Sequence, residues 1–192
     1  MPNTKNRKLN RLKGYNYSGD GWYFVTICAK NREHFFGKII NGEMRLSKIG
    51  ETAEKFWREI VIHFPDVKLD EFIIMPNHIH GIIIIANPAA VGNKNVGNNN
   101  YCSDDGNNNY CSLRRVAWQT KWARSLSSVI RGFKIGVKKW CGENNYEHFA
   151  WQKSFYDHII RNEKSLNKIR QYIIDNPLRW ELDRNNPENL WM

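Results

Sequence analysis

The stretch VKLDEFIIMPNHIHGIIIIA occupies residues 67–86. It holds two strand-like runs, Val67–Met75 and His78–Ala86, which are separated only by Pro76-Asn77. Such an arrangement predicts two neighbouring strands with a tight connection. Pro76 has no amide hydrogen for a strand ladder, so it belongs at a strand end.

The second run carries a pair of histidines that could bind a metal. Side chains of a strand alternate between faces, so His78 and His80 should project to one side and Ile79 to the other. Two imidazoles about 7 Å apart along a strand can converge on one ion by rotating inward. The alternative is a polar pair on the solvated face of a half-buried strand. The preceding Pro-Asn and the following apolar run favour the metal site.

Periodic patterns on either side of this stretch predict the other elements. They are a strand at 21–29, a hairpin around Asn41-Gly42, and helices at 47–63, 118–140 and 163–176. Asn162 is suited to cap the last helix, and Pro177 stops it.

The length of 192 residues suits one domain over 1–192. Residues 87–113 are rich in Asn and Gly and contain a tandem repeat, GNNNYCSDD followed by GNNNYCSLR. Such a composition cannot bury enough apolar surface to offset its ordering entropy, so we expect a flexible loop insertion. Residues 1–14 hold basic side chains and no acid, and we expect a basic N-terminal arm there.

The chain has a net charge of +10 and a pI near 9.5. A basic excess of this size predicts a polyanionic partner, and nucleic acid is favoured over an anionic membrane surface. The predicted helix at 118–140 also lacks acidic residues. The candidate DNA contacts are the basic residues of the arm, of this helix and of the segment before the last helix: Lys5, Arg7, Lys8, Arg11, Lys13, Lys121, Arg124, Arg131, Lys134, Lys138 and Arg161.

The last helix carries a second chemical signal. Tyr172 and Asn176 are four residues apart, so they lie on one face, one turn apart. A phenol is a weak nucleophile at neutral pH, but a metal that polarises the attacked phosphate lowers the demand on it. Asn176 could supply an oxygen that completes a site with two nitrogens and one oxygen. The alternative for Tyr172 is an ordinary core or cap tyrosine.

Three separated motifs resemble those of the REP-associated tyrosine transposases, which belong to the HUH (histidine, hydrophobic, histidine) single-strand DNA transposases. They are RLKGYNYS…GWYFVTICAKNR near the N-terminus, PNHIH between the strands, and WQKSFYDHIIRNEKSLNKIRQYIIDNP near the C-terminus. The resemblance covers nearly the whole chain apart from the Asn-rich tract. It implies an α+β fold: a ferredoxin-like or RRM-like antiparallel sheet with helices packed on it.

The resemblance also implies a mechanism. His78, His80 and Asn176 would bind Mg²⁺ or Mn²⁺, and Tyr172 would attack single-stranded DNA beside a hairpin-forming palindromic repeat. The products would be a 5′-phosphotyrosine and a free 3′-hydroxyl, and reversal by another strand's hydroxyl would join DNA ends. Relatives occur as monomers and as dimers, so a homodimer is a further expectation. Tyr156 is a rival nucleophile.

Three other functions compete with this one. They are a hairpin-binding protein without cleavage activity, a metal-dependent nuclease in which water attacks, and an RNA-binding module on a similar sheet. The longest apolar run, Ile82–Ala86, is far shorter than the ~20 residues of a membrane span, and no signal peptide is visible. The four cysteines form no CxxC pair. We therefore expect a cytoplasmic protein with reduced thiols.

Overall fold

The computed structural model describes residues 15, 17, 20–86, 125–182 and 186. Its centre is a four-stranded antiparallel sheet in the order β4-β5-β1-β6. The strands are β1 (Gly21–Cys28), β4 (Val67–Ile74), β5 (His78–Ile85) and β6 (Tyr156–Ile160). Together with α1 (Lys48–His63) and α3 (Leu126–Glu143) they form a β-α-β-β-α-β chain order, the ferredoxin-like arrangement. The predicted α+β fold class is confirmed.

The predicted tight connection joins β4 to β5. The amide of Met75 donates to the carbonyl of His78 at 2.8 Å, which closes the turn around Pro76 and Asn77. The carbonyl of Asn77 accepts from the amide of Ala29 at 2.8 Å, so the turn is also tied to the end of β1. Pro76 lies outside both strands, as its missing amide hydrogen requires.

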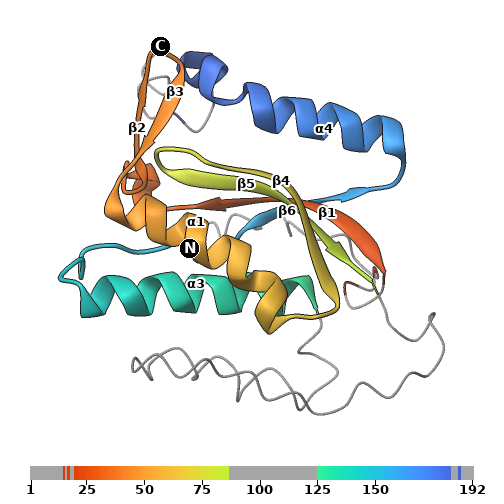
Figure 1. Cartoon of the computed structure of the whole chain (residues 1–192), viewed down its shortest axis with the longest axis horizontal. Helices are drawn as coiled ribbons and strands as arrows, with labels where there is room; N and C mark the ends of the chain where they lie inside the picture. The colour runs from red at the N-terminus through yellow and green to blue at the C-terminus, as the bar shows by residue number, and fades with distance from the viewer. Residues whose placement is uncertain (1–14, 16, 18–19, 87–124, 183–185, 187–192) are drawn as a thin grey trace, which may run out of the picture.

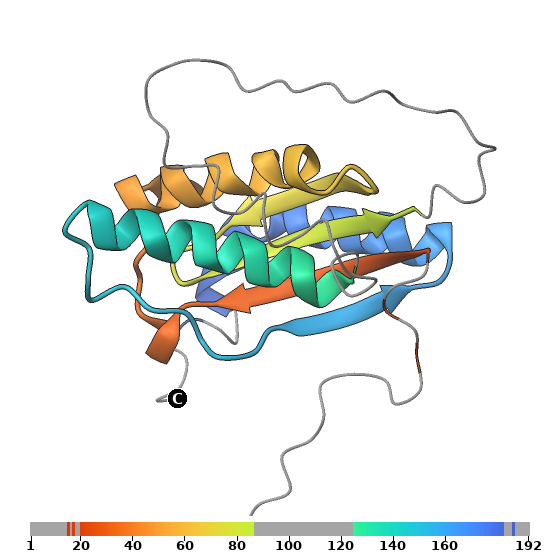
Figure 2. The same cartoon turned by 90° about the horizontal axis from the view of Figure 1, so that it is seen from below.

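Helices α1 and α3 cover one face of the sheet side by side (Figures 1 and 2). Ser47 caps α1 by accepting from the amide of Gly50. The main hydrophobic core lies between these helices and the sheet, and Trp57 is its largest fully buried side chain. Trp57 stacks on Phe72 and meets Phe133 edge to face.

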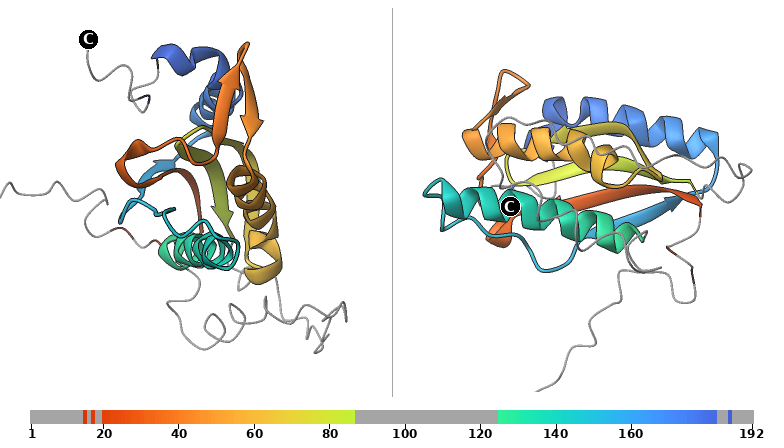
Figure 3. Two further views of the ribbon diagram at one scale, coloured as in Figure 1. Left: turned by 90° about the vertical axis from the view of Figure 1, so that its left-hand side faces the viewer. Right: turned by 60° about the horizontal axis from the view of Figure 1, so that its bottom comes forward.

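Helix α4 (Glu163–Asp175) covers the opposite face, so the sheet lies between two layers of helices (Figures 1 and 3). Asn162 caps it as predicted, accepting from the amide of Ser165 at 2.8 Å. A smaller apolar cluster lies beneath it: Ile82, Ile160, Leu166 and Ile173, with Phe24, Ile73, Ile84 and Ile169 at its rim. The 3-10 helix η5 (Pro177–Leu182) follows directly.

The predicted hairpin is also present. It consists of β2 (Gly37–Ile40) and β3 (Glu43–Leu46), which pair as a separate two-stranded sheet. Asn41 and Gly42 adopt positive φ of 52° and 75°, the conformation that a tight hairpin turn demands and that these two residue types accept readily. The short 3-10 helix η1 (Lys30–Arg32) follows β1.

Two sequence predictions need correction. A continuous helix over 118–140 is wrong, because Ser125 adopts an extended conformation and caps α3, which runs over Leu126–Glu143, through the amide of Ser128. Strand β6 was not predicted. It is only five residues long, and exposed and buried positions alternate only over its first three residues, too short a run to recognise from its pattern.

Several predictions lie outside the described residues. They are the basic arm at 1–14, the whole of the insertion at 87–113, and the first turns of the helix predicted from 118. Within the described part of the chain, no helix combines the length and the apolar character that crossing a bilayer requires.

Candidate active site and metal centre

The two histidines of β5 converge on one point beneath α4. His78 is completely buried and His80 is 2% exposed, which is inconsistent with a pair on a solvated face. Their Nε2 atoms lie 3.0 Å apart, and their ring planes are inclined at 73°. The inward rotation expected from their alternate positions is therefore present in the structure.

The other nitrogen of each ring is held by a neighbouring side chain. Asn77 donates from Nδ2 to the carbonyl of Arg32 at 3.0 Å, which turns its Oδ1 toward His78 Nδ1 at 2.8 Å. Because that oxygen can only accept, Nδ1 of His78 carries the proton and Nε2 has a lone pair. His80 Nδ1 lies 2.9 Å from the hydroxyl of Thr26, its partner across β1. Partners of this kind orient metal-ligating histidines.

The spacing of the two Nε2 atoms fits a shared cation. Two adjacent ligands of an octahedral ion, each about 2.1 Å from it and about 90° apart, lie about 3.0 Å from one another. The observed separation is 3.0 Å. A cation at this position would replace any proton that the two nitrogens share.

The tyrosine of α4 lies against this pair. The hydroxyl of Tyr172 is 3.3 Å from His80 Nε2, and its ring contacts both His80 and Phe24. Phe24 in turn stacks on His80 at 5.2 Å between centroids. Tyr172 remains 41% exposed, so a substrate can reach the phenol from solvent. It is therefore not a core tyrosine.

Asn176 follows Tyr172 by one helical turn and is 3% exposed. Its Oδ1 is buried without a hydrogen-bond partner, an arrangement that is costly for an amide oxygen. Tyr172 contacts His80, and Trp180 stacks on His78 at 6.1 Å, so Asn176 lies in the chain between two residues that each contact one histidine. A cation held by the imidazoles is a partner that this oxygen otherwise lacks.

Within the described residues, no group of three or more His, Cys, Asp or Glu side chains is placed to hold a metal. The predicted donor set, two imidazole nitrogens and one amide oxygen, would contain no carboxylate. Such a set leaves the charge of the ion largely uncompensated, which favours an anionic substrate such as a phosphodiester.

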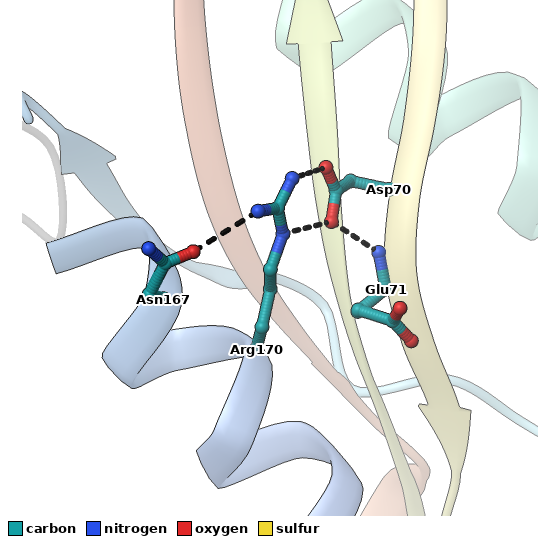
Figure 4. A network of polar contacts seen from close by, with 4 residues as sticks. All are labelled: Asp70, Glu71, Asn167 and Arg170. Atoms are coloured by element: carbon teal, nitrogen blue, oxygen red, sulfur yellow. Dashed lines mark hydrogen bonds and ion pairs between the residues drawn. The ribbon is translucent and has the colours of Figure 1, made fainter. Parts of the chain in front are cut away.

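A bidentate ion pair holds α4 on the sheet (Figure 4). Arg170 donates from Nε and Nη2 to the two carboxylate oxygens of Asp70 at 2.8 and 2.6 Å, and from Nη1 to Asn167 at 3.0 Å. Asp70 lies on β4 at a register irregularity between Leu69 and Phe72. The hydrogen bond from Arg170 lowers the pKa of Asp70 below its ordinary value, and the amide of Glu71 acts in the same direction. The pair fixes α4 two residues before Tyr172.

The basic residues predicted to contact DNA are placed differently from one another. Lys134 donates to the carbonyls of Gln152 and Ser154, and burial lowers the pKa of Lys134 to about 8. Lys138 similarly donates to two carbonyls, at 3.0 and 2.6 Å. These hydrogen bonds tie α3 to the segment that leads to β6, which gives both lysines a structural role.

The remaining predicted contacts divide into two groups. Arg131 and Arg161 are exposed. The others lie outside the described residues: Lys5, Arg7, Lys8, Arg11, Lys13, Lys121 and Arg124.

The sequence analysis missed four residues that shape the site: Thr26, Asp70, Arg170 and Trp180. No spacing rule reveals them, because each meets its partner across the sheet or from another element. The orienting role of Asn77 had a visible signal, since it directly precedes His78 in a motif already singled out.

Comparisons with known proteins find relatives of this chain and of its fold. No family model matches the chain. An uncharacterized protein of Haemophilus influenzae is 41% identical over 179 residues, which are 93% of this chain and 92% of that protein. A second protein of H. influenzae, provisionally named a REP-associated tyrosine transposase, is 25% identical over 163 residues, 85% of this chain and 73% of that protein.

A solved structure of a REP-associated tyrosine transposase bound to a REP hairpin superposes with a TM-score of 0.56 at 18% identity, covering 88% of this chain and 74% of that one. The sequence relative and the structural neighbour thus confirm the predicted resemblance. The chain belongs to one family with the 41% identical H. influenzae protein, and its fold is that of a REP-associated tyrosine transposase.

Proposed function

We propose that this protein is a tyrosine transposase that cuts and rejoins single-stranded DNA beside a hairpin, with Tyr172 as the nucleophile. One observation carries the proposal: the Tyr172 hydroxyl lies 3.3 Å from a buried imidazole whose Nε2 is 3.0 Å from that of a second histidine. All of these side chains belong to one chain, so a single subunit can hold the complete site.

The ligands of the divalent ion would be Nε2 of His78, Nε2 of His80 and Oδ1 of Asn176. When bound there, Mg²⁺ or Mn²⁺ would supply positive charge to the non-bridging oxygens of the scissile phosphate. Asn77 and Thr26 keep the two imidazoles turned toward that point. The closely packed rings of Phe24 and Trp180 exclude water from one side of it.

In the reaction, the oxygen of Tyr172 forms a bond to phosphorus while the bond from phosphorus to the 3′-oxygen breaks. The phenol loses its proton, and the departing 3′-oxygen gains one. The phosphate stays attached to the tyrosine as a 5′-phosphotyrosine diester. A phosphodiester is thus exchanged for another one and is not hydrolysed. Attack by the 3′-hydroxyl of another strand then restores a phosphodiester and frees Tyr172.

The partner would be DNA with a hairpin. The net charge of +10 supports a polyanionic partner. The structural neighbour with a TM-score of 0.56 is bound to a REP hairpin, and its common fold supports a similar substrate here. The RNA-binding alternative needs an open sheet with exposed aromatic residues on its central strands. Helices cover both faces of this sheet, which disfavours that alternative (Figure 3).

The test is a cleavage assay on labelled single-stranded hairpins with randomised flanks, in the presence of Mn²⁺. We expect nicked DNA and a covalent protein–DNA adduct on denaturing gels, both abolished by EDTA. Tyr172→Phe should reduce adduct formation by on the order of 10³-fold or more, because it removes the nucleophile. Tyr156→Phe is the matched control, since it removes the other tyrosine hydroxyl of this sheet face, and it should leave the adduct unchanged.

Other outcomes would identify the competing functions. Nicking without an adduct, unchanged in Tyr172→Phe, would show that water is the nucleophile. Hairpin binding without nicking at any metal concentration would show a binding protein without cleavage activity. An adduct that maps to Tyr156 would contradict the assignment of Tyr172.

A further inference from the structure

An exposed row of side chains continues from the active site to the edge of the sheet. Thr26, which bonds His80, pairs across β1 with Tyr156 of β6. His80, Thr26 and Tyr156 therefore form one cross-strand row with their side chains on the same face. With strands about 4.8 Å apart, the backbone of Tyr156 lies about 10 Å from that of His80.

The next row repeats this arrangement. Phe24, which stacks on His80 and contacts Tyr172, pairs with His158 of β6. Tyr156 is 45% exposed, and His158 is exposed beside it. The edge strand thus presents two flat rings to solvent, both on the face that carries the active site.

The path of α4 explains why these rings stay uncovered. The helix starts just after the end of β6, where Ile160 and Leu166 pack together, and runs toward β4, where Arg170 binds Asp70. Tyr156 and His158, in the first half of β6, are accordingly exposed. Among the described residues, no helix or strand covers the Tyr156 ring, so a partner can reach it from solvent.

A hollow of about 450 Å³ adjoins the second ring. His158, Arg161 and Asp157 are among the residues that line it. The guanidinium of Arg161 suits the phosphate of a nucleotide, and the exposed ring of His158 suits its base. A cationic group and a flat ring that line one hollow match a nucleotide better than a free phosphate.

We propose that Tyr156 and His158 form a stacking platform for the single-stranded DNA that flanks the scissile phosphate, and that the hollow beside Arg161 receives the next nucleotide. The inference rests on the proposed function, because it takes its occupant from the strand that Tyr172 would attack. Three observations favour single-stranded DNA: the rows are continuous with the candidate active site, the rings are flat and exposed, and the guanidinium of Arg161 lines the hollow beside the second ring. A base that stacks here must be unpaired, so a duplex does not fit.

The binding test uses fluorescence anisotropy with a thymidine oligonucleotide about 16 nucleotides long, in EDTA, so that neither metal nor cleavage contributes. We expect Tyr156→Ala to weaken binding by about 5- to 150-fold, the range that one stacked base contributes. Tyr156→Phe keeps the ring and should bind like the wild type. Ile62→Ala, at a side chain 72% exposed on α1, is the control for an unrelated surface change.

A second measurement locates the platform. A 2-aminopurine base is moved position by position along the flank of a hairpin oligonucleotide, and its fluorescence reports stacking. We expect quenching one to three nucleotides from the cleavage position, lost in Tyr156→Ala and kept in Tyr156→Phe. Equal affinity of Tyr156→Ala and the wild type, or a loss in Tyr156→Phe as large as in Tyr156→Ala, would overturn the proposal.

The two proposals fail in distinguishable ways. If the wild-type protein forms the Tyr172 adduct but Tyr156→Ala binds DNA normally, the platform is wrong and the transposase function stands. If no adduct forms but the oligonucleotide affinity still depends on the Tyr156 ring, the platform stands and the cleavage function is wrong.

Discussion

The two faces of the central sheet differ in what they bury. On β1, the side chains of Tyr23, Val25 and Ile27 face α1 and α3 and are completely buried in the main core. The residues between them include Phe24 and Thr26, which face α4 and contact His80. The side chains on one face of β1 thus form the core, and those on its other face support the candidate active site.

This difference has a physical consequence for the effects of substitutions. The face under α1 and α3 is dense in aromatic side chains, whereas the face under α4 combines a small apolar cluster with buried polar groups. Substitutions on the first face should therefore change the free energy of unfolding but not the activity of the folded protein. Substitutions on the second face should affect metal binding or DNA cleavage more than the free energy of unfolding.

The largest expected effect is on the packing face. Trp57→Ala should lower the free energy of unfolding by about 3–5 kcal/mol, since it removes a fully buried indole that stacks on Phe72. Urea denaturation measures this. Ile62→Ala, on the same helix and exposed, should change stability by less than about 0.5 kcal/mol. In Trp57→Ala, DNA cleavage per folded molecule should equal that of the wild type. A loss of cleavage in this variant without a loss of stability would contradict the separation of the two faces.

A smaller effect is expected where the active-site face orients a ligand. Asn77→Ala removes the oxygen that holds the proton on His78 Nδ1, so the ring can turn or change tautomer. We expect Mn²⁺ affinity to fall by about 10- to 100-fold, as measured by isothermal titration calorimetry. Asn144→Ala removes an exposed amide at the end of α3 and serves as the control. Unchanged Mn²⁺ affinity in Asn77→Ala would contradict the orienting role.

The smallest effect is expected at the ion pair that holds α4. Asp70→Asn should lower stability by about 1 kcal/mol near neutral pH, because the pair is partly exposed. The pKa of Asp70 is lowered in the folded state, so its carboxylate stabilises the fold above about pH 4. This contribution is lost as the pH falls through the folded-state pKa, and the two proteins should then converge in stability.

Denaturation of both proteins over a range of pH measures this convergence. Glu43→Gln, at an exposed pair with Arg45, is the matched control and should show a smaller effect at every pH. A constant difference between Asp70→Asn and the wild type at all pH values would show that the carboxylate is not the source of the stabilisation.

Much of the fold and part of the site could be predicted from the sequence. The hairpin turn at Asn41-Gly42, the cap at Asn162 and the Pro76-Asn77 connection follow from local backbone chemistry. The placement of two histidines on one strand face follows from the period of two. The predicted start of α3 was wrong because the helical spacing of apolar residues extends to positions before Ser125, the extended residue that caps the start of the helix.

The sequence by itself determined the side-chain types and their local spacing: two histidines on one face of a strand, and a tyrosine and an asparagine on one face of a helix. The tertiary structure alone decided that these faces meet, because the sheet order β4-β5-β1-β6 and the Arg170–Asp70 pair hold α4 over β5. The same order places Tyr156 in the row of His80, two strands away. Local periodicity cannot show such relations, since they join residues that are 54 to 100 positions apart in the chain.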